Sequence, residues 1–272
     1  MAQAAKKPSP KNDSRAVSKA ADKGVPSTDV LSFERDAGAG LEGADQDCYA
    51  QPFLTLLQKM SPQVDRDSDK YIKGASAGDF LNGATGEVYD GKKGVVLVPV
   101  HFERKYVEWG QRDDGGGFKG SYRPDEINLA DLERDDSGRF QKGDNYLADT
   151  RYHYCIQLTP DGRRNIVLSL TSTQIKKSRN WVTAMSMIRF EGKNGKPFCP
   201  PTFAHAWRIT TVAESNDKGS WHGVKIEKER VLGKGDEAVV AEARALQALA
   251  RGGRIRVDEA TDTQEVVHAD KF

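Results

Sequence analysis

The sequence has few cysteines and no long apolar run. Its three cysteines, Cys48, Cys155 and Cys199, lie far apart in the 272-residue chain, which excludes a disulfide framework and a zinc-finger spacing. The longest apolar run, Val95–Val100, is far shorter than the ~20 residues of a membrane-spanning helix. The basic N-terminal segment has no apolar core, so no secretory signal is expected. We therefore expect a soluble protein of a reducing cytoplasm.

The chain also has almost no net charge, because 41 basic residues oppose 40 acidic ones. The charges are nevertheless segregated. Residues 151–210 contain ten basic and two acidic side chains, whereas residues 257–272 contain five acidic side chains and one basic one. Residues 1–24 are basic and residues 125–150 are acidic. Blocks of opposite charge predict different partners for different parts of the chain.

Both ends of the chain have few large apolar residues. A segment of that composition cannot bury enough surface to offset the entropy of ordering. We therefore predict a disordered basic arm over residues 1–46 and a flexible acidic tail over residues 252–272, after the glycine pair Gly252–Gly253. The folded domain is then expected to span residues 47–251.

Apolar periodicity and turn residues predict the elements of this domain. In the first half we expect a short helix from Pro52 to before Pro62, then a hairpin of strands 86–89 and 94–109 with a bulge or edge at Pro99, and then a long mobile loop over 115–149. Strands 152–159 and 165–171 follow, with a helix after them that carries Ile175, Val182 and Met185. The domain is expected to end with a hairpin of strands 205–213 and 221–231 and a helix over 236–251.

The order of these elements indicates a mainly β fold of the α+β class. Three strands, a helix and two further strands follow one another, as in the five-stranded barrel of the oligonucleotide-binding (OB) fold. The sequence therefore predicts an OB-like barrel with insertions, a helix between its third and fourth strands, a C-terminal helix and disordered tails.

No enzyme signature stands out. Gly74–Gly78 matches the nucleophile pattern G-x-S-x-G, but the strand before it and the helix after it are not predicted. The glycine-rich segments lack the spacing of a phosphate-binding loop, and the five histidines lack metal-ligand spacing. The many carboxylates of residues 125–149 leave a magnesium-dependent nuclease as an alternative, although a solvated turn is the simpler interpretation of residues 135–138. We predict no enzymatic activity, cofactor or metal.

Cations alternate with aromatic residues on several predicted strands and on the first long helix. Aromatic faces stack on unpaired bases and cations follow the phosphates, so this pattern is typical of single-strand binding. The alternative is that the aromatic residues belong to the core. The predicted DNA-binding residues are Arg104, Lys105, Tyr106, Trp109, Arg151, Tyr152, Lys176, Lys177, Arg179, Trp181, Trp207, Arg208, Trp221 and Lys225.

The C-terminal residues form a second pattern, an acidic segment that ends on an aromatic residue. Its candidate partner-binding residues are Asp258, Glu259, Asp262, Asp270 and Phe272. This tail resembles that of bacterial and phage single-stranded DNA-binding proteins. The resemblance implies that the tail binds replication or recombination proteins and competes with DNA for the basic surface. A terminus that only aids solubility is the alternative.

The body of the chain resembles a group of bacteriophage proteins of replication and recombination. The segments that carry the resemblance are Gly86–Gly91, Val98–Val100 with Glu108–Trp109, Ser172–Lys176, Pro200–Phe203 and Glu214–Trp221. It implies a phage protein of the host cytoplasm that coats and protects single-stranded DNA, with a possible homo-oligomer and no membrane partner. A virion structural or assembly protein is the alternative, and a nuclease or recombinase accessory ranks third.

Overall fold

The computed structural model describes residues 36, 39–44, 48–49, 51–111, 116–136, 138–217, 219–255 and 257. The chain divides into two units, Met1–Gly40 and Leu41–Phe272. The fold described below is that of the second unit. Most of the predicted basic arm lies outside the described residues.

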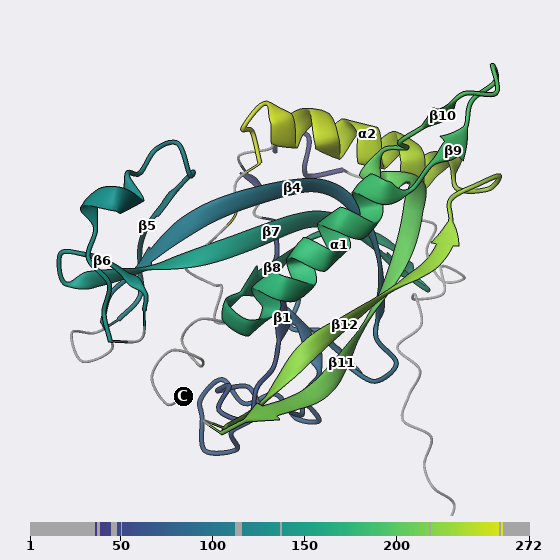
Figure 1. The fold of residues 1–272 in the computed structure, drawn as a ribbon. Helices are drawn as coiled ribbons and strands as arrows, with labels where there is room; N and C mark the ends of the chain where they lie inside the picture. The colour runs from purple at the N-terminus through teal and green to yellow at the C-terminus, as the bar shows by residue number, and fades with distance from the viewer. Residues whose placement is uncertain are drawn as a thin grey trace, which may run out of the picture. The chain divides into compact units, whose positions relative to one another are not determined.

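The described residues contain twelve strands and two α-helices, so the prediction of a mainly β, α+β fold is confirmed (Figure 1). Neither helix in this part of the chain is long and apolar enough to cross a membrane. The strands are β1 (Leu54–Leu56), β2 (Phe80–Asn82), β3 (Val88–Tyr89), β4 (Val95–Trp109), β5 (Phe118–Tyr122), β6 (Phe140–Lys142), β7 (Asn145–Thr159), β8 (Gly162–Thr171), β9 (Phe190–Glu191), β10 (Pro197–Phe198), β11 (His205–Asn216) and β12 (Gly219–Val231), and the helices are α1 (Ile175–Met187) and α2 (Glu237–Arg251).

The main sheet is built around the two long antiparallel strands β4 and β7. Its path runs β12-β11-β4-β7-β6, with β5 paired to β4 and β8 paired to β7. One half of the β4–β7 pair lies between β11 and β8, and the other half extends away as an arm between β5 and β6. The pairing register shifts between Pro99 and His101, so the bulge predicted at Pro99 is confirmed. Proline lacks the N–H that a regular ladder needs.

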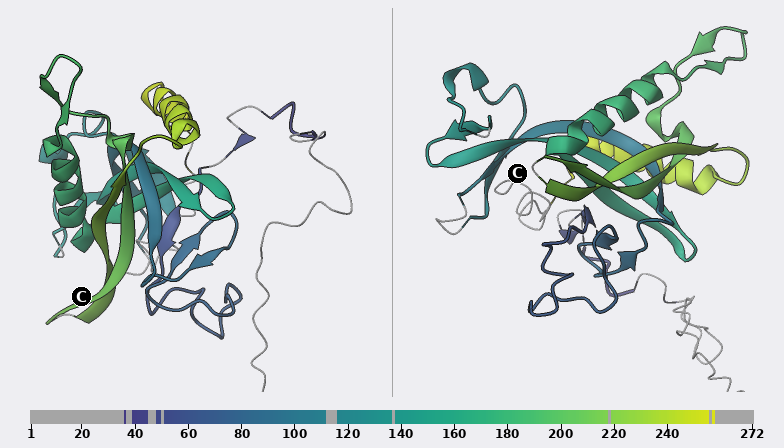
Figure 2. Two further views of the ribbon diagram at one scale, coloured as in Figure 1. Left: turned by 90° about the vertical axis from the view of Figure 1, so that its right-hand side faces the viewer. Right: turned by 60° about the horizontal axis from the view of Figure 1, so that its bottom comes forward.

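The sheet carries a core on each face. On one face, Leu97 and Cys155 pack with Trp181 and Met185 of α1. On the other, Val98 and Ile156 pack with α2. Neighbouring residues of a strand point to opposite faces, so α1 and α2 cover opposite sides of the sheet, as the two views of Figure 2 show.

The sheet does not close into a barrel, because β8 and β12 are not paired with each other within the described ranges. Phe53 bridges Val167 at the edge of β8. The edge of β12 is covered by two glutamines. Gln58 accepts a hydrogen bond from the backbone N–H of His222 at 2.8 Å and donates to its carbonyl at 2.9 Å, and Gln174 accepts from the N–H of Val224 at 2.9 Å.

Two predictions for the first part of the domain are wrong. The segment after Pro52 is not a helix, because residues 54–56 form β1 and are buried on both faces. A short apolar run of that kind does not distinguish a helix from a buried strand. Residues 86–109 are not a hairpin, because β3 pairs with β2. The turn between β3 and β4 instead accepts a hydrogen bond from Thr211 of β11 at the carbonyl of Gly91.

The predicted mobile loop over 115–149 is also wrong for its described residues. It contains β5, β6 and the start of β7. These strands pair with the arm of β4 and β7, and a two-residue turn at Gly143 and Asp144 joins β6 to β7. The glycine of this turn has a φ of 61°, in the left-handed region that glycine adopts without strain. This two-residue turn is the sequence signal for the β6–β7 hairpin, which the sequence prediction did not include.

The later elements are confirmed with changes of boundary, the largest of them at β7, which begins at Asn145 rather than at residue 152. They are the β7–β8 pair, α1, the β11–β12 hairpin and α2. The chain continues to pack against the body beyond the predicted start of the tail at residue 252. Ile255 and Val257 contact the core cluster of Phe53 and Tyr152, and Val257 forms a parallel bridge with Gln51.

Candidate functional site

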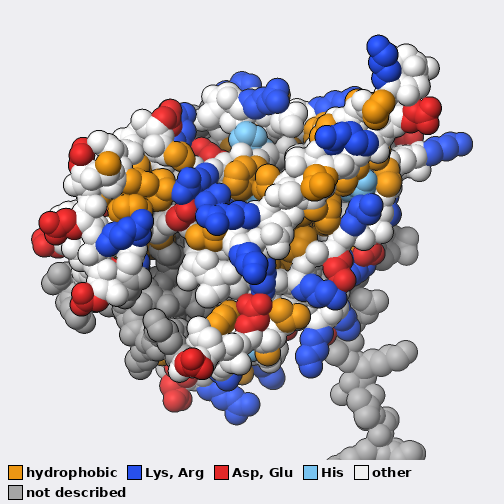
Figure 3. Space-filling model, in the orientation of Figure 1, with side chains coloured by type: hydrophobic (Ala, Val, Ile, Leu, Met, Phe, Trp, Pro, Cys, Tyr) orange, Lys and Arg blue, Asp and Glu red, His pale blue; other side chains and the backbone are white. Residues whose placement is uncertain are grey.

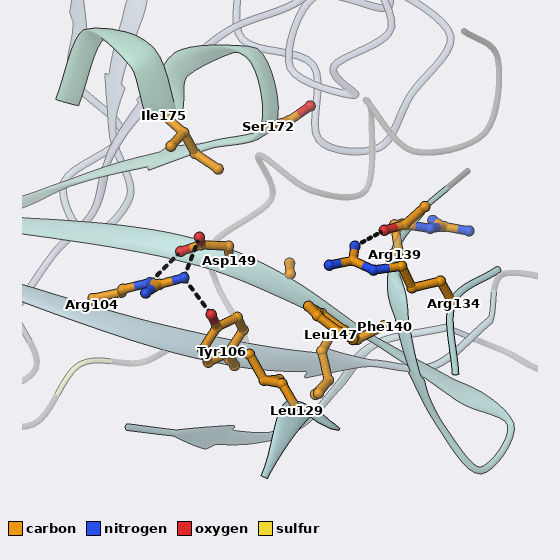
Figure 4. A pocket seen from close by; sticks show the side chains of 12 residues that line it. Arg104, Tyr106, Leu129, Arg134, Arg139, Phe140, Leu147, Asp149, Ser172 and Ile175 are labelled. Carbon is orange, nitrogen blue, oxygen red and sulfur yellow. Dashed lines mark hydrogen bonds and ion pairs between the residues drawn. The ribbon is translucent and has the colours of Figure 1, made fainter. Parts of the chain in front are cut away.

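A cavity of about 490 Å³, here called the arginine cavity, lies where the β4–β7 arm meets the start of α1. One wall comes from the arm, a second from the connection between β5 and β6, and the third from Ser172 and Ile175. Figure 4 shows Arg104, Tyr106 and Asp149 on one side of it and Arg134, Arg139 and Phe140 on the other. The sheet thus brings together cations that are up to 35 residues apart in the chain.

The side formed by the arm holds two arginines on one carboxylate. Arg104 binds Asp149 through two hydrogen bonds, of 2.8 and 3.1 Å, and also donates to the hydroxyl of Tyr106. Arg151, directly across the strand pair from Arg104, binds the same carboxylate at 2.9 Å. The three charged groups leave one net positive charge, and the shared carboxylate fixes both guanidinium groups in place.

The opposite side holds two further arginines. The guanidinium carbon of Arg134 lies 3.8 Å from the centroid of the Phe140 ring, and Arg134 also donates to the carbonyl of Gly138. Among the described residues no carboxylate pairs with Arg134. Arg139 pairs with Asp135 at 2.7 Å. This side therefore adds one more uncompensated positive charge.

The pKa shifts agree with a positive site. Burial by itself raises the pKa of Asp149, but the hydrogen bonds from Arg104 and Arg151 outweigh it and hold that pKa below its ordinary value. The hydrogen bond to Asp149 in turn raises the pKa of Arg104. Burial raises the pKa of Tyr106, so its hydroxyl stays protonated at neutral pH. The site keeps its charge across the physiological range.

The backbone at the third wall has an uncommon conformation. Ser172 has a φ of 47°, the one positive φ of a non-glycine residue in the described part of the chain. Such a conformation costs of order 1–3 kcal/mol and is often found at binding sites. It leads from the end of β8 into a short 3-10 turn, Ser172–Gln174, which continues into α1, and the N–H of Ile175 donates to the carbonyl of Ser172. Neither Thr171 nor Gln174 caps this helical segment with its side chain. The N-terminal end of the segment therefore adds partial positive charge beside the arginines.

Five of the predicted DNA-binding residues occur in or beside this cavity. Arg104 and Tyr106 line it, and Arg151 shares the carboxylate of Asp149. Lys176 and Arg179 are exposed on α1 next to it and have no ion-pair partner among the described residues. Figure 3 shows basic side chains gathered beside the start of α1, over β4 and β7.

The sequence analysis missed Arg134, Arg139 and Phe140. They belong to a stretch whose net charge is negative and that was interpreted as a mobile loop. Arg139 and Phe140 stand at the start of β6, one short turn before β7. The two-residue turn at Gly143 would have identified this strand and placed both residues against the arm.

The predicted stacking residues are, with one exception, part of the core. Each of them is 5% exposed or less, so they do not form the exposed stacking surface that the sequence predicted; they are Tyr106, Trp109, Tyr152, Trp181 and Trp207. Trp221 is half-buried and donates its indole N–H to Glu214 at 2.9 Å. Apolar alternation on a strand does not distinguish an exposed aromatic residue from a core one.

The remaining predicted cations are held by acidic neighbours away from the cavity. Lys177 pairs with Glu214 at 2.5 Å. Arg208 pairs with Glu229 at 2.6 Å, and Lys225 with Glu227 at 2.9 Å. Lys105 lies on the opposite face of β4, with its ammonium group 5.5 Å from the ring of Tyr152.

A second cavity of about 510 Å³ lies between α1 and the β11–β12 hairpin. Parts of Trp181 and Trp207 line it, together with apolar residues of the hairpin. Lys177 and Glu214 neutralise each other at one end. This cavity lacks the uncompensated charge of the first.

The structure also shows where the residues of the alternative sites lie. Within the described ranges, no three metal-ligating side chains lie together. Asp135, one of the carboxylates in the stretch 125–149 that could hold magnesium, pairs with Arg139. Gly74–Gly78 is a loop before β2, with no strand directly before it and no helix after it in the structure. The tail residues Asp258, Glu259, Asp262, Asp270 and Phe272 lie outside the described residues.

Comparison with known proteins places the chain in a phage family. No curated protein and no solved structure shows a significant similarity to it. A family model described as Pam3 phage gp34-like protein matches residues 20–256, which is most of the chain and includes every residue of the arginine cavity. The chain belongs to the Pam3 phage gp34-like protein family.

Proposed function

We propose that this protein binds and coats single-stranded DNA during phage DNA replication or recombination, and that DNA contacts the basic surface around the arginine cavity. The observation that carries the proposal is the convergence of Arg104, Arg134 and Arg139 on one face of the sheet with Lys176 and Arg179, which have no ion-pair partner in the described part of the chain. Cations in that arrangement neutralise successive phosphates. Membership of a phage family supports the biological setting.

The strand order supports an OB-like relationship. In the order β12-β11-β4-β7-β8, with α1 between β8 and β11, these strands follow the fifth, fourth, first, second and third strands of that fold. The connection between the first two strands then carries β5, β6 and the cavity. OB folds bind oligonucleotides with this connection and with the face of their second and third strands.

The face of β7 and β8 that points away from α1 is covered, which limits where DNA would bind. Phe53, Ile255 and Val257 pack there against Tyr152 and Val167. We therefore propose that the strand follows the arm and α1 rather than the outer face of β7 and β8.

Binding of labelled oligo-dT at increasing salt tests the proposal. Lys176→Ala combined with Arg179→Ala should weaken binding and flatten the slope of log affinity against log salt by about 1.4 units, because each of the two phosphate contacts on a single strand contributes about 0.7. Lys234→Ala combined with Arg244→Ala is the matched control, since both residues are exposed and Arg244 lies on α2, across the sheet from the cavity.

Absence of binding to oligo-dT at low salt would contradict the proposal. Equal losses in the test and control variants would also contradict it, because the attraction would then be spread over the whole surface. A chain that retains no DNA and sediments as large particles would support the alternative of a virion assembly protein.

A further inference from the structure

Apolar side chains line the arginine cavity beside its cations, and a bound phosphate alone would not need them. Tyr106 and Leu147 are each 3% exposed and form its base. Leu129, Phe140 and Ile175 are partly buried and line its sides. A surface site for phosphates alone needs only the cations, so the accessible apolar surface of these three side chains points to a ligand with both a flat apolar group and an anionic group.

The volume fits a small ligand of that kind. Pockets for small molecules usually measure 300–1,000 Å³ and combine apolar walls with a few polar groups. At about 490 Å³ the cavity is large enough for one nucleotide, whose base is flat and whose phosphate is anionic. A base of a single strand is free to leave its neighbours and enter such a pocket.

The arginines are placed for the phosphate rather than for the base. Arg104 is held at the cavity wall by Asp149 and Tyr106, so little entropy is lost when it binds. Arg134 stacks on Phe140 and has no carboxylate partner among the described residues, so its charge is available to an anion. Planar guanidinium groups match the geometry of phosphate oxygens.

We propose that this cavity holds one unstacked nucleotide of the bound single strand, with the base against Leu129, Phe140 and Ile175 and the phosphate between Arg104 and Arg134. The inference rests on the proposed function, since it names what the strand places in the site. It also makes a separate claim, because such a pocket should bind a free mononucleotide more tightly than it binds the nucleoside alone or phosphate alone.

The first experiment compares three probes on the full chain at low salt. Titration with dTMP, thymidine and inorganic phosphate, followed by calorimetry, should give a dissociation constant for dTMP at least tenfold below those of thymidine and phosphate. Equal affinities for dTMP and phosphate would overturn the inference, because only an anion site would remain. Absence of dTMP binding would overturn it as well.

The second experiment fills the cavity without removing a charge. Ile175→Trp should weaken dTMP binding at least tenfold and leave the salt slope for oligo-dT unchanged. Thr183→Trp is the matched control, because it places the same side chain on the exposed face of α1 and should change neither property. Arg134→Ala provides an independent variant on the opposite wall and should also weaken dTMP binding at least tenfold. Normal dTMP affinity in Ile175→Trp and Arg134→Ala would overturn the inference.

The results separate the inference from the proposed function. If oligo-dT binds with the expected salt slope but dTMP does not bind, the nucleotide pocket is wrong and the function stands. If dTMP binds and oligo-dT does not bind any better, the pocket stands and the coating function is wrong.

Discussion

At the scale of single residues, His153 illustrates a side chain that the fold keeps uncharged. It is 1% exposed, lies parallel to Trp181 at a centroid distance of 4.6 Å and shares a 2.8 Å hydrogen bond with Ser178. Burial, assisted by the charge of Arg151, lowers the pKa of His153 to about 3. Its ordinary pKa is about 6.5, so between these values the unfolded chain takes up a proton that the folded chain does not.

The free energy of unfolding should therefore fall as the pH drops from about 6.5 towards 3. This one group contributes about 1.4 kcal/mol per pH unit to the slope, and its contribution is constant above pH 6.5. Urea unfolding at several pH values should show that His153→Gln removes this part of the slope. Ser178→Ala keeps the imidazole buried and should lower stability while it preserves the slope. An unchanged slope in His153→Gln would contradict the prediction.

Asp149 provides a second prediction at this scale. Asp149→Asn removes the carboxylate shared by Arg104 and Arg151, so two guanidinium groups lose their partner. We expect a loss of about 1–3 kcal/mol in stability and, under the proposed function, tighter binding of oligo-dT with a steeper salt slope. Glu229→Gln is the matched control, because it frees Arg208 on the β11–β12 hairpin. Weaker DNA binding by a folded Asp149→Asn would contradict the expectation.

At the scale of elements, the turn between β3 and β4 depends on a close backbone contact. A Cβ at Gly91 would stand 1.7 Å from the carbonyl oxygen of Gly78, and Thr211 donates to the carbonyl of Gly91 at 2.8 Å. Gly91→Ala must therefore displace the turn from β11. Thermal unfolding should show a destabilisation of about 1–3 kcal/mol. Gly233→Ala has open space around the new methyl group and should unfold like the parent chain.

The elements that the sequence predicted well are those with long, unambiguous periodicity. The helices α1 and α2 and the β11–β12 hairpin have apolar stripes or clear turns. β1 was mistaken for a helix because its three residues are buried on both faces, which removes the alternation that identifies a strand. β5 and β6 are too short to show a period, and only pairing with the arm of β4 and β7 orders them.

The candidate site was predicted only in part, because some of its residues lie on elements with clear periodicity and others on strands that long-range pairing orders. Arg104, Arg151, Lys176 and Arg179 stand on well-predicted elements and were identified from their charge. The second wall of the cavity comes from Arg134 and Phe140, whose approach to the arm depends on long-range pairing. Whether a tryptophan belongs to the core or to the surface depends on which face of the sheet α1 covers, and local spacing does not determine that.

At the scale of the whole described domain, the chain after α2 completes the core on the face opposite α1. Ile255 and Val257 cover Phe53, Tyr152 and Val167. A chain that ends at Arg251 should therefore unfold several degrees below the full chain, whereas one that ends at Val257 should unfold like it. Calorimetry of the two truncated chains measures this directly. Equal midpoints for the two would place the true domain boundary at Gly252.

The truncation after Val257 also isolates the acidic residues that the sequence analysis assigned to partner binding. Under the proposed function its loss should tighten oligo-dT binding at low salt, with a gain that shrinks as salt rises, because screened charges no longer compete. The stability comparison above keeps this effect separate from any damage to the fold. Unchanged DNA affinity at low salt would contradict a competing role for the tail.

The two glutamines that bind the edge of β12 affect how the protein behaves at high concentration. A bare strand edge recruits the edges of other molecules and leads to aggregation. Gln58 and Gln174 occupy the backbone groups of His222 and Val224 that a foreign strand would need. Two side-chain amides thus substitute for a neighbouring strand along this part of β12, and they should hinder its pairing with the sheet of another molecule at high protein concentration.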